Sequence, residues 1–204
     1  MKRPAASTRT VKDASGAEVP DDALLVLYAN GDRQAAAELT RRMLPRALAV
    51  ATRVLGDRAE AEDVAQEAML RLWRVAPEWR MGEARVSTWL YRVTMNLCVD
   101  LRRKRRAPQV ALEDAPEPSD DGPSAAEQLL AADRHDALQA ALMQLPDRQR
   151  QAVVLRHLEE LANPEIAEIL GVGVEAVESL TARGKRALTA ALRQRRDELG
   201  YHHD

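Results

Sequence analysis

The sequence is poor in aromatic residues and in cysteine. Phenylalanine is absent, aromatic residues make up only 3% of the 204 positions, and Cys98 is the single cysteine. One cysteine excludes an internal disulfide. No apolar run is long enough to cross a bilayer or to serve as a signal peptide, so we expect a protein of the reducing cytoplasm with no membrane insertion.

Sequence patterns of catalysis and metal binding are also missing. There is no nucleophile paired with a base, no glycine-rich phosphate loop, and no ligand spacing between the four histidines and cysteine or acidic residues. The sequence therefore predicts no enzyme, no catalytic residue, no metal, no cofactor and no small-molecule substrate. The net charge of −2 does not by itself indicate a nucleic-acid partner, but the charges are segregated along the chain.

The composition that remains favours helices. Alanine, leucine, arginine and glutamate dominate, and 204 residues suffice for one large or two small domains. A stretch rich in proline, serine and acidic residues divides the chain and indicates a flexible linker. We predict an all-α protein with a disordered leader at 1–20, a helical domain at 21–106, an acidic flexible linker at 107–126, a second helical domain at 127–199 and a tail at 200–204.

The most informative stretch runs from Asn163 to Arg186. Asn163 is a good helix N-cap, Pro164 suits the first turn, Gly171 ends a short helix, and apolar residues then recur at helical spacing from Val174. This pattern predicts a helix-turn-helix. Such a corner also occurs in plain helical bundles, but the cations in the second half of its second helix favour DNA. The outward face of that helix is predicted to hold Glu175, Glu178, Ser179, Ala182, Arg183 and Arg186.

In the first domain, acidic residues mark the predicted helix starts. Asp22 is expected to cap a first helix and Asp32 a second. Asp57 is expected to cap a third, supported by Glu60 three residues later in a capping-box arrangement. Pro45 lies within the second helix, so we expect it to bend or interrupt that helix.

The helix that Asp57 begins has a mixed outer face. Its inner stripe is made of alanine and aliphatic residues, whereas the opposite face combines acids with a leucine and a tryptophan. Such a face suits docking on a basic protein partner, although an ordinary solvated face is the alternative. The residues of this docking face are Asp63, Gln66, Glu67, Leu70 and Trp73.

A fourth helix is predicted from its N-cap Ser87 to Leu101, and it continues into the basic run Arg102–Arg106. The helix macrodipole favours cations at this end, but five consecutive cations exceed what the dipole requires. Together with Arg92 and Asn96 they form a track suited to the phosphates of a nucleic acid.

Two helical units joined by an acidic linker, the first ending in a basic helix and the second holding a helix-turn-helix, resemble a bacterial RNA polymerase sigma factor. The resemblance is to the extracytoplasmic-function (ECF) type of the sigma-70 superfamily, covers about 22–199, and depends on the joint order of four stretches. These stretches are Ala61–Glu67, Ser87–Arg92 with Asn96 and Asp100, Leu145–Arg150, and Glu165–Val172.

The resemblance implies a sigma-2-like first domain and a sigma-4-like second domain. It assigns the docking face to the large-subunit clamp of core RNA polymerase, and the linker to the neighbourhood of the RNA exit path. For the single-stranded minus-ten element of the promoter, it implies Arg80, Arg85, Ser87, Thr88, Tyr91, Arg92, Asn96, Arg102 and Arg103. For the duplex minus-thirty-five element, it implies Glu178, Ser179, Ala182 and Arg183, with Lys185 and Arg186 on phosphate.

The function implied by the resemblance is to bind core polymerase and direct it to specific promoters, in a stress or envelope response under an anti-sigma factor. Two departures stand out. Arg92 and Val93 stand where primary sigma factors carry an adjacent aromatic pair, so weaker duplex opening and stricter promoter choice are expected. Glu178 and Leu180 stand where many relatives carry lysine and arginine, and the carboxylate of Glu178 can accept a hydrogen bond from a cytosine amino group.

Two other functions stay open at this point. A helix-turn-helix regulator that is not a polymerase subunit needs a sensing or dimerising N-terminal unit, whereas this unit ends in a basic helix. A helical adaptor that does not touch DNA has no use for two separated cationic helices.

Overall fold

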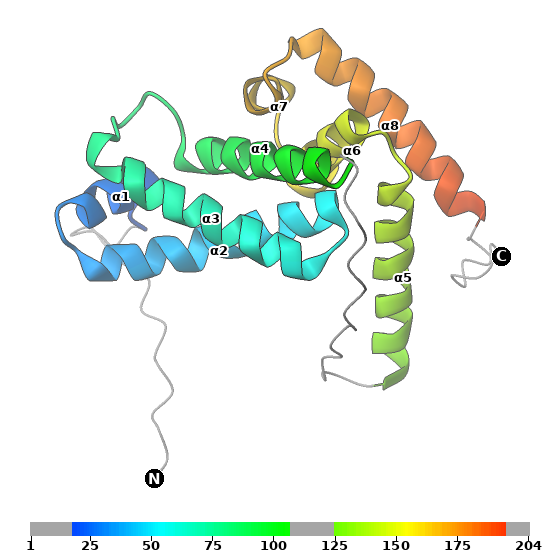
Figure 1. The fold of residues 1–204 in the computed structure, drawn as a ribbon, viewed down its shortest axis with the longest axis horizontal. Coiled ribbons are helices and arrows are strands. Elements are labelled where there is room, and N and C mark those ends of the chain that lie inside the picture. The colour runs from blue at the N-terminus through cyan, green and yellow to red at the C-terminus, as the bar shows by residue number, and fades with distance from the viewer. Residues whose placement is uncertain (1–17, 107–124, 195–204) are drawn as a thin grey trace.

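The computed structural model describes residues 18–106 and 125–194, with the side chains of 18–105 and 133–193. The first unit consists of α1 (Asp21–Ala29), α2 (Arg33–Leu55), α3 (Arg58–Val75), a 3₁₀ turn η1 (Ala76–Glu78) and α4 (Val86–Arg106). The second consists of α5 (Ala125–Met143), α6 (Asp147–Val153), a π-helical turn η2 (Val154–Leu158), α7 (Asn163–Leu170) and α8 (Val174–Gln194). The predicted all-α fold with two helical units is confirmed (Figure 1).

Parts of the predicted organisation lie outside the described residues, among them 195–199 at the end of the predicted second domain. The leader at 1–20 and the linker at 107–126 lie outside the described residues, except for 18–20 and for 125–126, which belong to α5. The tail at 200–204 lies outside them entirely.

The first unit is built around the long helix α2, on which α1, α3 and α4 pack (Figure 1). With no phenylalanine in the sequence, leucine and methionine fill its core. Leu24, Leu39, Met43 and Leu72 are all fully buried there. Close packing of such side chains fixes the relative positions of the helices that carry the candidate sites.

Two of the predicted helix caps in the first unit are confirmed. The Oδ1 atom of Asp32 accepts hydrogen bonds from the N–H groups of Gln34 and Ala35, at 2.8 and 3.1 Å. Asp57 accepts from the N–H of Glu60 at 2.9 Å. The carboxylate of Glu60 does not turn back to complete a capping box, because it accepts a 2.7 Å hydrogen bond from Arg105 of α4 instead.

Two other predicted caps are wrong. Helix α1 begins after Pro20, which has no side-chain cap, and Asp22 lies inside the helix. Helix α4 begins at Val86, so Ser87 is already helical. The Oδ1 atom of Asp22 accepts a 3.2 Å hydrogen bond from the N–H of Val86. The acceptor for the first N–H of α4 therefore comes from a residue 64 positions away in the sequence.

Of the two effects expected at Pro45, a bend or an interruption, the interruption is wrong, because α2 is one helix from Arg33 to Leu55. A proline in a helix interior removes one backbone hydrogen bond and crowds the preceding turn. Here Met43 and Ala47, on either side of the proline, are both fully buried in the core. Packing on both sides therefore holds the helix together across the proline.

In the second unit, the predicted helix-turn-helix is formed by α7 and α8. Gly171 ends α7 in the left-handed conformation, with φ of 64°, as the sequence predicts. The predicted cap is displaced by one residue, because Ala162 is the N-cap and Asn163 is already in the helix. Glu165 accepts a 3.1 Å hydrogen bond from the N–H of Ala162, so the backbone N–H of the cap residue has a partner.

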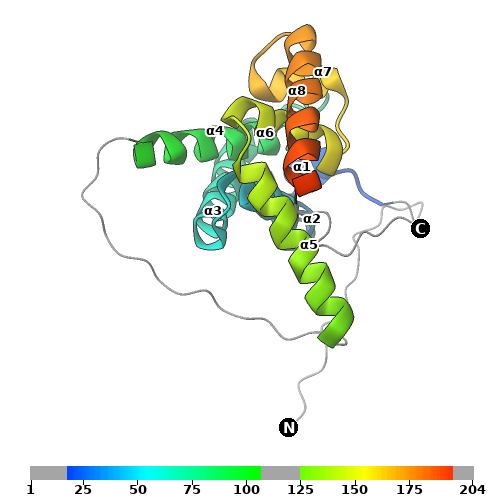
Figure 2. The same cartoon turned by 90° about the vertical axis from the view of Figure 1, so that its right-hand side faces the viewer.

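The two units pack against each other through a shared apolar core. Helix α4 of the first unit lies beside α7 of the second (Figure 1, Figure 2). Residues buried in this core include Tyr91 and Met95 from α4 and Ile166 and Leu170 from α7. Helix α5 contacts α2, where Gln139 donates to the backbone carbonyls of residues 52 and 53 at 3.2 and 3.3 Å.

Candidate nucleic-acid interfaces and docking face

The cationic helix α4 and the loop before it form the first candidate interface. Of the residues predicted for it, Arg80, Asn96 and Arg103 are exposed, while Ser87 is half-buried. Arg103 forms an ion pair with Asp100 at 3.1 Å. These groups lie on the solvent side of the first unit and are open to a ligand.

Other predicted residues of this interface are covered. Thr88 and Tyr91 are 5% and 4% exposed, so neither is accessible to a nucleic acid in this structure. The Oη atom of Tyr91 donates a 2.6 Å hydrogen bond to Glu159, which follows η2 in the second unit. Burial and this hydrogen bond to the carboxylate raise the pKa of Tyr91 well above its ordinary value.

Acidic side chains of the second unit also face the predicted cations of the first. Arg92 donates to Glu168 of α7 at 2.5 Å, and the neighbouring Arg85 donates to Glu165 of α7 at 3.0 Å. The residue pairs lie 76 and 80 positions apart in the sequence. No local sequence pattern connects these partners, so only the packing of the two units could reveal them.

The C-terminal half of α4 makes a further ionic contact with the second unit. Arg102 lies 2.9 Å from Asp147, in the first turn of α6, and also donates to the carbonyl of Val54 at 3.4 Å. The same oxygen of Asp147 accepts a 2.5 Å hydrogen bond from the fully buried Arg150. Asp147 therefore joins a core arginine of the second unit to an arginine of the first.

The second candidate interface is the outer face of α8. It is a long amphipathic helix whose inner side is held by Val177, Thr181 and Gly184, all buried. Gly184 permits a close approach to α6, because a Cβ there would come within 2.5 Å of the Val153 side chain. The residues predicted for duplex DNA are all exposed: Glu178, Ser179, Ala182, Arg183, Lys185 and Arg186.

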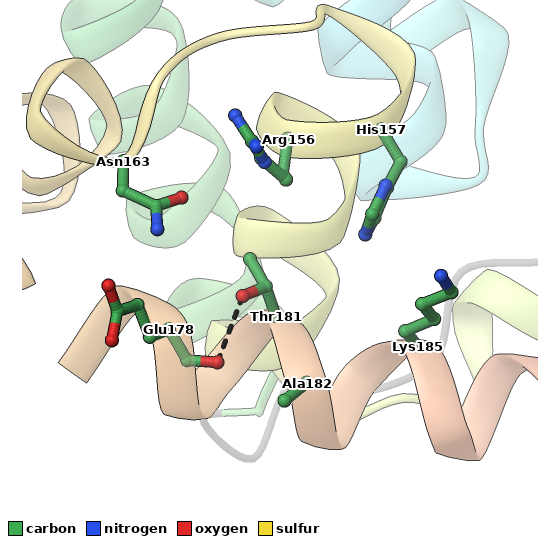
Figure 3. Close-up of a pocket in the computed structure, with 7 residues that line it drawn as sticks. All are labelled: Arg156, His157, Asn163, Glu178, Thr181, Ala182 and Lys185. Carbon is green, nitrogen blue, oxygen red and sulfur yellow. Dashed lines mark hydrogen bonds between the residues drawn. The ribbon is translucent and has the colours of Figure 1, made fainter. Parts of the chain in front are cut away.

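A hollow of about 290 Å³ lies beside this face of α8 (Figure 3). Its lining residues are Arg156, His157, Asn163, Glu178, Thr181, Ala182 and Lys185. Arg156 donates to the carbonyl of Leu161 at 2.8 Å, which orients its guanidinium. Burial and the nearby Lys185 and Arg156 lower the pKa of His157. Sequence reasoning missed Arg156 and His157, because they precede the helix-turn-helix and join α8 only in the fold.

The predicted docking face lies on α3. Asp63, Gln66 and Leu70 are exposed, and the 49% exposure of Leu70 is high for such a residue. Glu67 accepts a 2.8 Å hydrogen bond from Arg71, and this contact lowers the pKa of Glu67. The spacing of these residues places them on one side of the helix.

Trp73, at the end of the docking face, is half-buried. Its ring packs at a tilt against Tyr28 of α1, with 4.5 Å between the ring centroids. The tryptophan is therefore held in position by the first unit, and part of its surface remains free for a partner.

Neither thiol chemistry nor a metal centre is suggested by the described part of the chain. Cys98 is fully buried, and burial raises the pKa of its thiol to about 12. Within residues 18–106 and 125–194, no group of three His, Cys, Asp or Glu residues is placed to hold a metal ion. None of the helices in those ranges has the length and apolarity of a transmembrane span.

A helix-turn-helix with an exposed polar face, a separate cationic helix and a helix with a partly acidic outer face are together typical of a DNA-binding transcription protein. Comparison with known families agrees with this class. Residues 39–107 match the family model for sigma-70 region 2, and residues 135–188 match that for sigma-70 region 4.

Similarity to known proteins narrows the assignment from a class of transcription proteins to one family. The ECF RNA polymerase sigma factor SigW of Bacillus subtilis (strain 168) is 32% identical over 174 residues, covering 80% of this chain and 91% of SigW. SigM, an ECF RNA polymerase sigma factor of Mycobacterium tuberculosis (strain H37Rv), is 35% identical over 179 residues, covering 86% of each chain. The chain belongs to the ECF family of RNA polymerase sigma factors.

A solved structure supports the same assignment. CnrH, in complex with the cytosolic domain of CnrY, superimposes with a TM-score of 0.64 at 26% sequence identity. The match covers 85% of this chain and 97% of CnrH. These relatives agree with a sigma factor rather than with a helix-turn-helix regulator that acts without polymerase. The family comprises transcription initiation factors rather than catalytic enzymes.

Proposed function

We propose that this sigma factor uses three separate surfaces to bring core RNA polymerase to a promoter. The docking face on α3 binds the clamp of the large subunit, α4 with its preceding loop holds the single-stranded minus-ten element, and α8 reads the minus-thirty-five element as duplex. The observation that carries the proposal is that one chain presents the exposed polar face of a helix-turn-helix and a separate cationic helix. Either surface alone would serve an ordinary DNA-binding protein.

For the minus-thirty-five element, the exposed side chains of α8 divide by chemistry. Glu178, Ser179 and Ala182 are short or acidic and suit the edges of bases, with the carboxylate accepting from a cytosine amino group. Arg183 belongs with these base-reading residues, while Arg186 reaches the phosphate backbone. The hollow of Figure 3 is also lined by Arg156, His157 and Lys185. The cations Arg156 and Lys185 suit a phosphate at the edge of the DNA groove.

For polymerase docking, the chemistry is that of a small interface with an anchored aromatic. The acids Asp63, which is exposed, and Glu67, which is half-buried, suit a basic partner, while Leu70 and Trp73 offer apolar surface that a partner can cover. Activity of this kind belongs to the cytoplasm, where polymerase and chromosome are found. The chain itself performs no catalysis in this scheme, because the polymerase makes the RNA.

A regulatory partner follows from the relatives. CnrH is bound to the cytosolic domain of CnrY, and by analogy this chain is held inactive by an anti-sigma factor until a stress or envelope signal arrives. Regulation of this kind would keep the docking face away from polymerase.

The proposed docking face is tested by charge reversal. Asp63→Lys with Glu67→Lys is expected to abolish co-purification with core polymerase, because the two introduced lysines would repel a basic partner. The matched control is Asp133→Lys with Asp136→Lys, which makes the same charge change at exposed positions of α5. Circular dichroism checks that both variants stay folded. Retained co-purification of the α3 variant would contradict the assignment.

Promoter recognition is tested with purified chain, core polymerase and a library of promoter fragments. Sequencing of the transcripts is expected to show start sites that share two spaced upstream elements. DNA binding without polymerase, and no polymerase-dependent transcripts, would favour an independent regulator instead.

A further inference from the structure

We propose that the second unit masks the minus-ten surface of the first in the free protein, with carboxylates of α6, α7 and the loop after η2 placed where DNA would bind. The inference rests on the assignment of α4 to the minus-ten element in the proposed function. What it adds is a closed state in which the chain competes with promoter DNA for its own binding groups.

The two most enclosed contacts hold the closed state together. Tyr91 is 4% exposed and donates to Glu159 at 2.6 Å, so the phenol is unavailable for stacking on a base. Arg102 and Asp147 lie 2.9 Å apart, with their side chains 18% and 26% exposed. Charge-assisted contacts shielded from water are stronger than those on the surface.

Two further contacts lie at the rim. Arg92 meets Glu168 at 2.5 Å with side chains 40% and 49% exposed, and Arg85 meets Glu165 at 3.0 Å with Arg85 78% exposed. Exposed ion pairs are weak and are screened by salt. These contacts therefore occupy the cations without holding them irreversibly, and a polyanion can displace the carboxylates.

An apolar joint lies beneath the ionic contacts. Met95 of α4 and Ile166 of α7 are buried to within 1% of complete coverage, and both belong to the core that the two units share. Opening would expose this surface to water, which favours closure in the free protein. Binding of the units to polymerase and promoter would have to offset the free-energy cost of exposing that surface.

The chemistry of the four contacts identifies the ligand that they imitate. Each places a carboxylate oxygen against a predicted DNA-binding donor: Arg85, Tyr91, Arg92 and Arg102. Phosphate oxygens of a single strand are acceptors of the same charge sign. Closure and binding of the minus-ten strand are therefore mutually exclusive, and each must weaken the other.

The closed state is tested first by charge exchange at the rim, using the full chain without polymerase or DNA. Glu168→Arg places two cations together and is expected to increase the radius of gyration in small-angle X-ray scattering at low salt. Arg92→Glu combined with Glu168→Arg restores opposite charges and is expected to return the radius to the wild-type value. Equal radii for all three proteins would overturn the proposal.

Masking is tested by DNA binding with variants confined to the second unit. Glu159→Gln with Glu168→Gln removes two of the carboxylates but leaves every predicted DNA-binding group in place. The control, Asp133→Asn with Glu160→Gln, removes the same charge from exposed positions of the second unit. The probe is a fluorescein-labelled single-stranded DNA of random sequence, about 12 nucleotides long.

The masking variant is expected to bind this probe about three to five times more tightly than the control variant, since a larger fraction of molecules is open. Equal affinities of the two variants would overturn the proposal. Neither arm contains polymerase, so a failure of the docking face on α3 would leave both results unaffected. Conversely, a result that overturns the masking proposal would not bear on polymerase binding by α3, which the charge-reversal experiment tests separately.

Discussion

Glu38 is a buried carboxylate held between two arginines of its own helix. It accepts hydrogen bonds from Arg41 at 2.6 Å and from Nε of Arg42 at 2.7 Å. Arg42 also donates to the carbonyl of Val19 at 2.8 Å, which ties the segment before α1 to α2. The hydrogen bond from Arg41 is the main cause that lowers the pKa of Glu38 from 4.5 to about 2, and burial opposes it.

This lowered pKa predicts a stability that depends on pH. Because the folded protein binds the proton less readily than the unfolded chain, the contribution of Glu38 is complete above its ordinary pKa of 4.5 and is lost as the pH falls towards about 2. We expect Glu38→Gln to lower the thermal unfolding midpoint at pH 7 and to have little effect near the acid end of this range. Thermal scans of both proteins across the range measure this, with the exposed Glu175→Gln as control. A constant difference between the proteins at all pH values would contradict it.

At the scale of elements, the start of α4 depends on α1. The N–H of Val86 has its acceptor in Asp22, so the helix that carries the minus-ten residues is fixed at one end by another helix. We expect Asp22→Ala to lower the free energy of unfolding by about 1 kcal/mol, as loss of a helix cap does. Ser87→Ala serves as the comparison and should change it much less, because Ser87 is already helical. Chemical denaturation measures both, and a larger loss for Ser87→Ala would contradict the structure.

The packing of α8 on α6 depends on a glycine. Alanine usually stabilises a helix by about 1 kcal/mol relative to glycine. At Gly184 the added Cβ would meet the Val153 side chain at 2.5 Å and the carbonyl of Gln149 at 3.1 Å, so one helix must shift. We expect Gly184→Ala to destabilise the protein by about 1–3 kcal/mol.

The comparison for this glycine is Gly173→Ala, where the added Cβ has only an ordinary contact at 3.5 Å. Replacing a glycine at the start of a helix has a cost of its own. Beyond that cost, Gly173→Ala should lower the free energy of unfolding by no more than a few tenths of a kcal/mol. Denaturant unfolding of both variants measures the difference. A gain of stability at Gly184→Ala would show that α6 and α8 are less closely packed than described.

Local signals made some elements predictable and left others hidden. Asp32 and Asp57 cap helices within three residues of themselves, so the sequence sufficed to predict them. Asp22 acts 64 residues away, and no pattern of neighbours can indicate that. The continuity of α2 through Pro45 likewise depends on burial that only the fold provides.

The candidate sites show the same division. Helical periodicity sufficed to place the exposed face of α8 and the docking face of α3, because both are defined by spacing within one helix. The partners of α4 were not predictable, because Glu159 and Glu168 reach it from a different unit. Arg156 and His157 approach α8 through the same kind of tertiary contact.

At the scale of the whole molecule, the shared core couples the stability of the two units. All three tryptophans, Trp73, Trp79 and Trp89, belong to the first unit, so their fluorescence reports its unfolding. We expect Ile166→Ala, in the second unit, to destabilise the chain by about 2–4 kcal/mol by leaving a cavity in the shared core. The tryptophan-detected midpoint should fall with it.

Thr189→Ala, at an exposed position of α8, is the control for this measurement and should leave the midpoint unchanged. Far-ultraviolet circular dichroism recorded in parallel follows the helices of both units. An unchanged tryptophan curve beside a shifted helix signal would show that the units unfold independently.

The buried thiol of Cys98 has a practical consequence. At a pKa of about 12, only a minute fraction of the thiol is ionised at neutral pH, and its full burial keeps alkylating reagents away. Dyes can therefore be attached at chosen surface cysteines without first replacing the native one. Because the buried thiol does not react in the folded state, the slow rate at which iodoacetamide labels Cys98 would report how often the protein opens and exposes it.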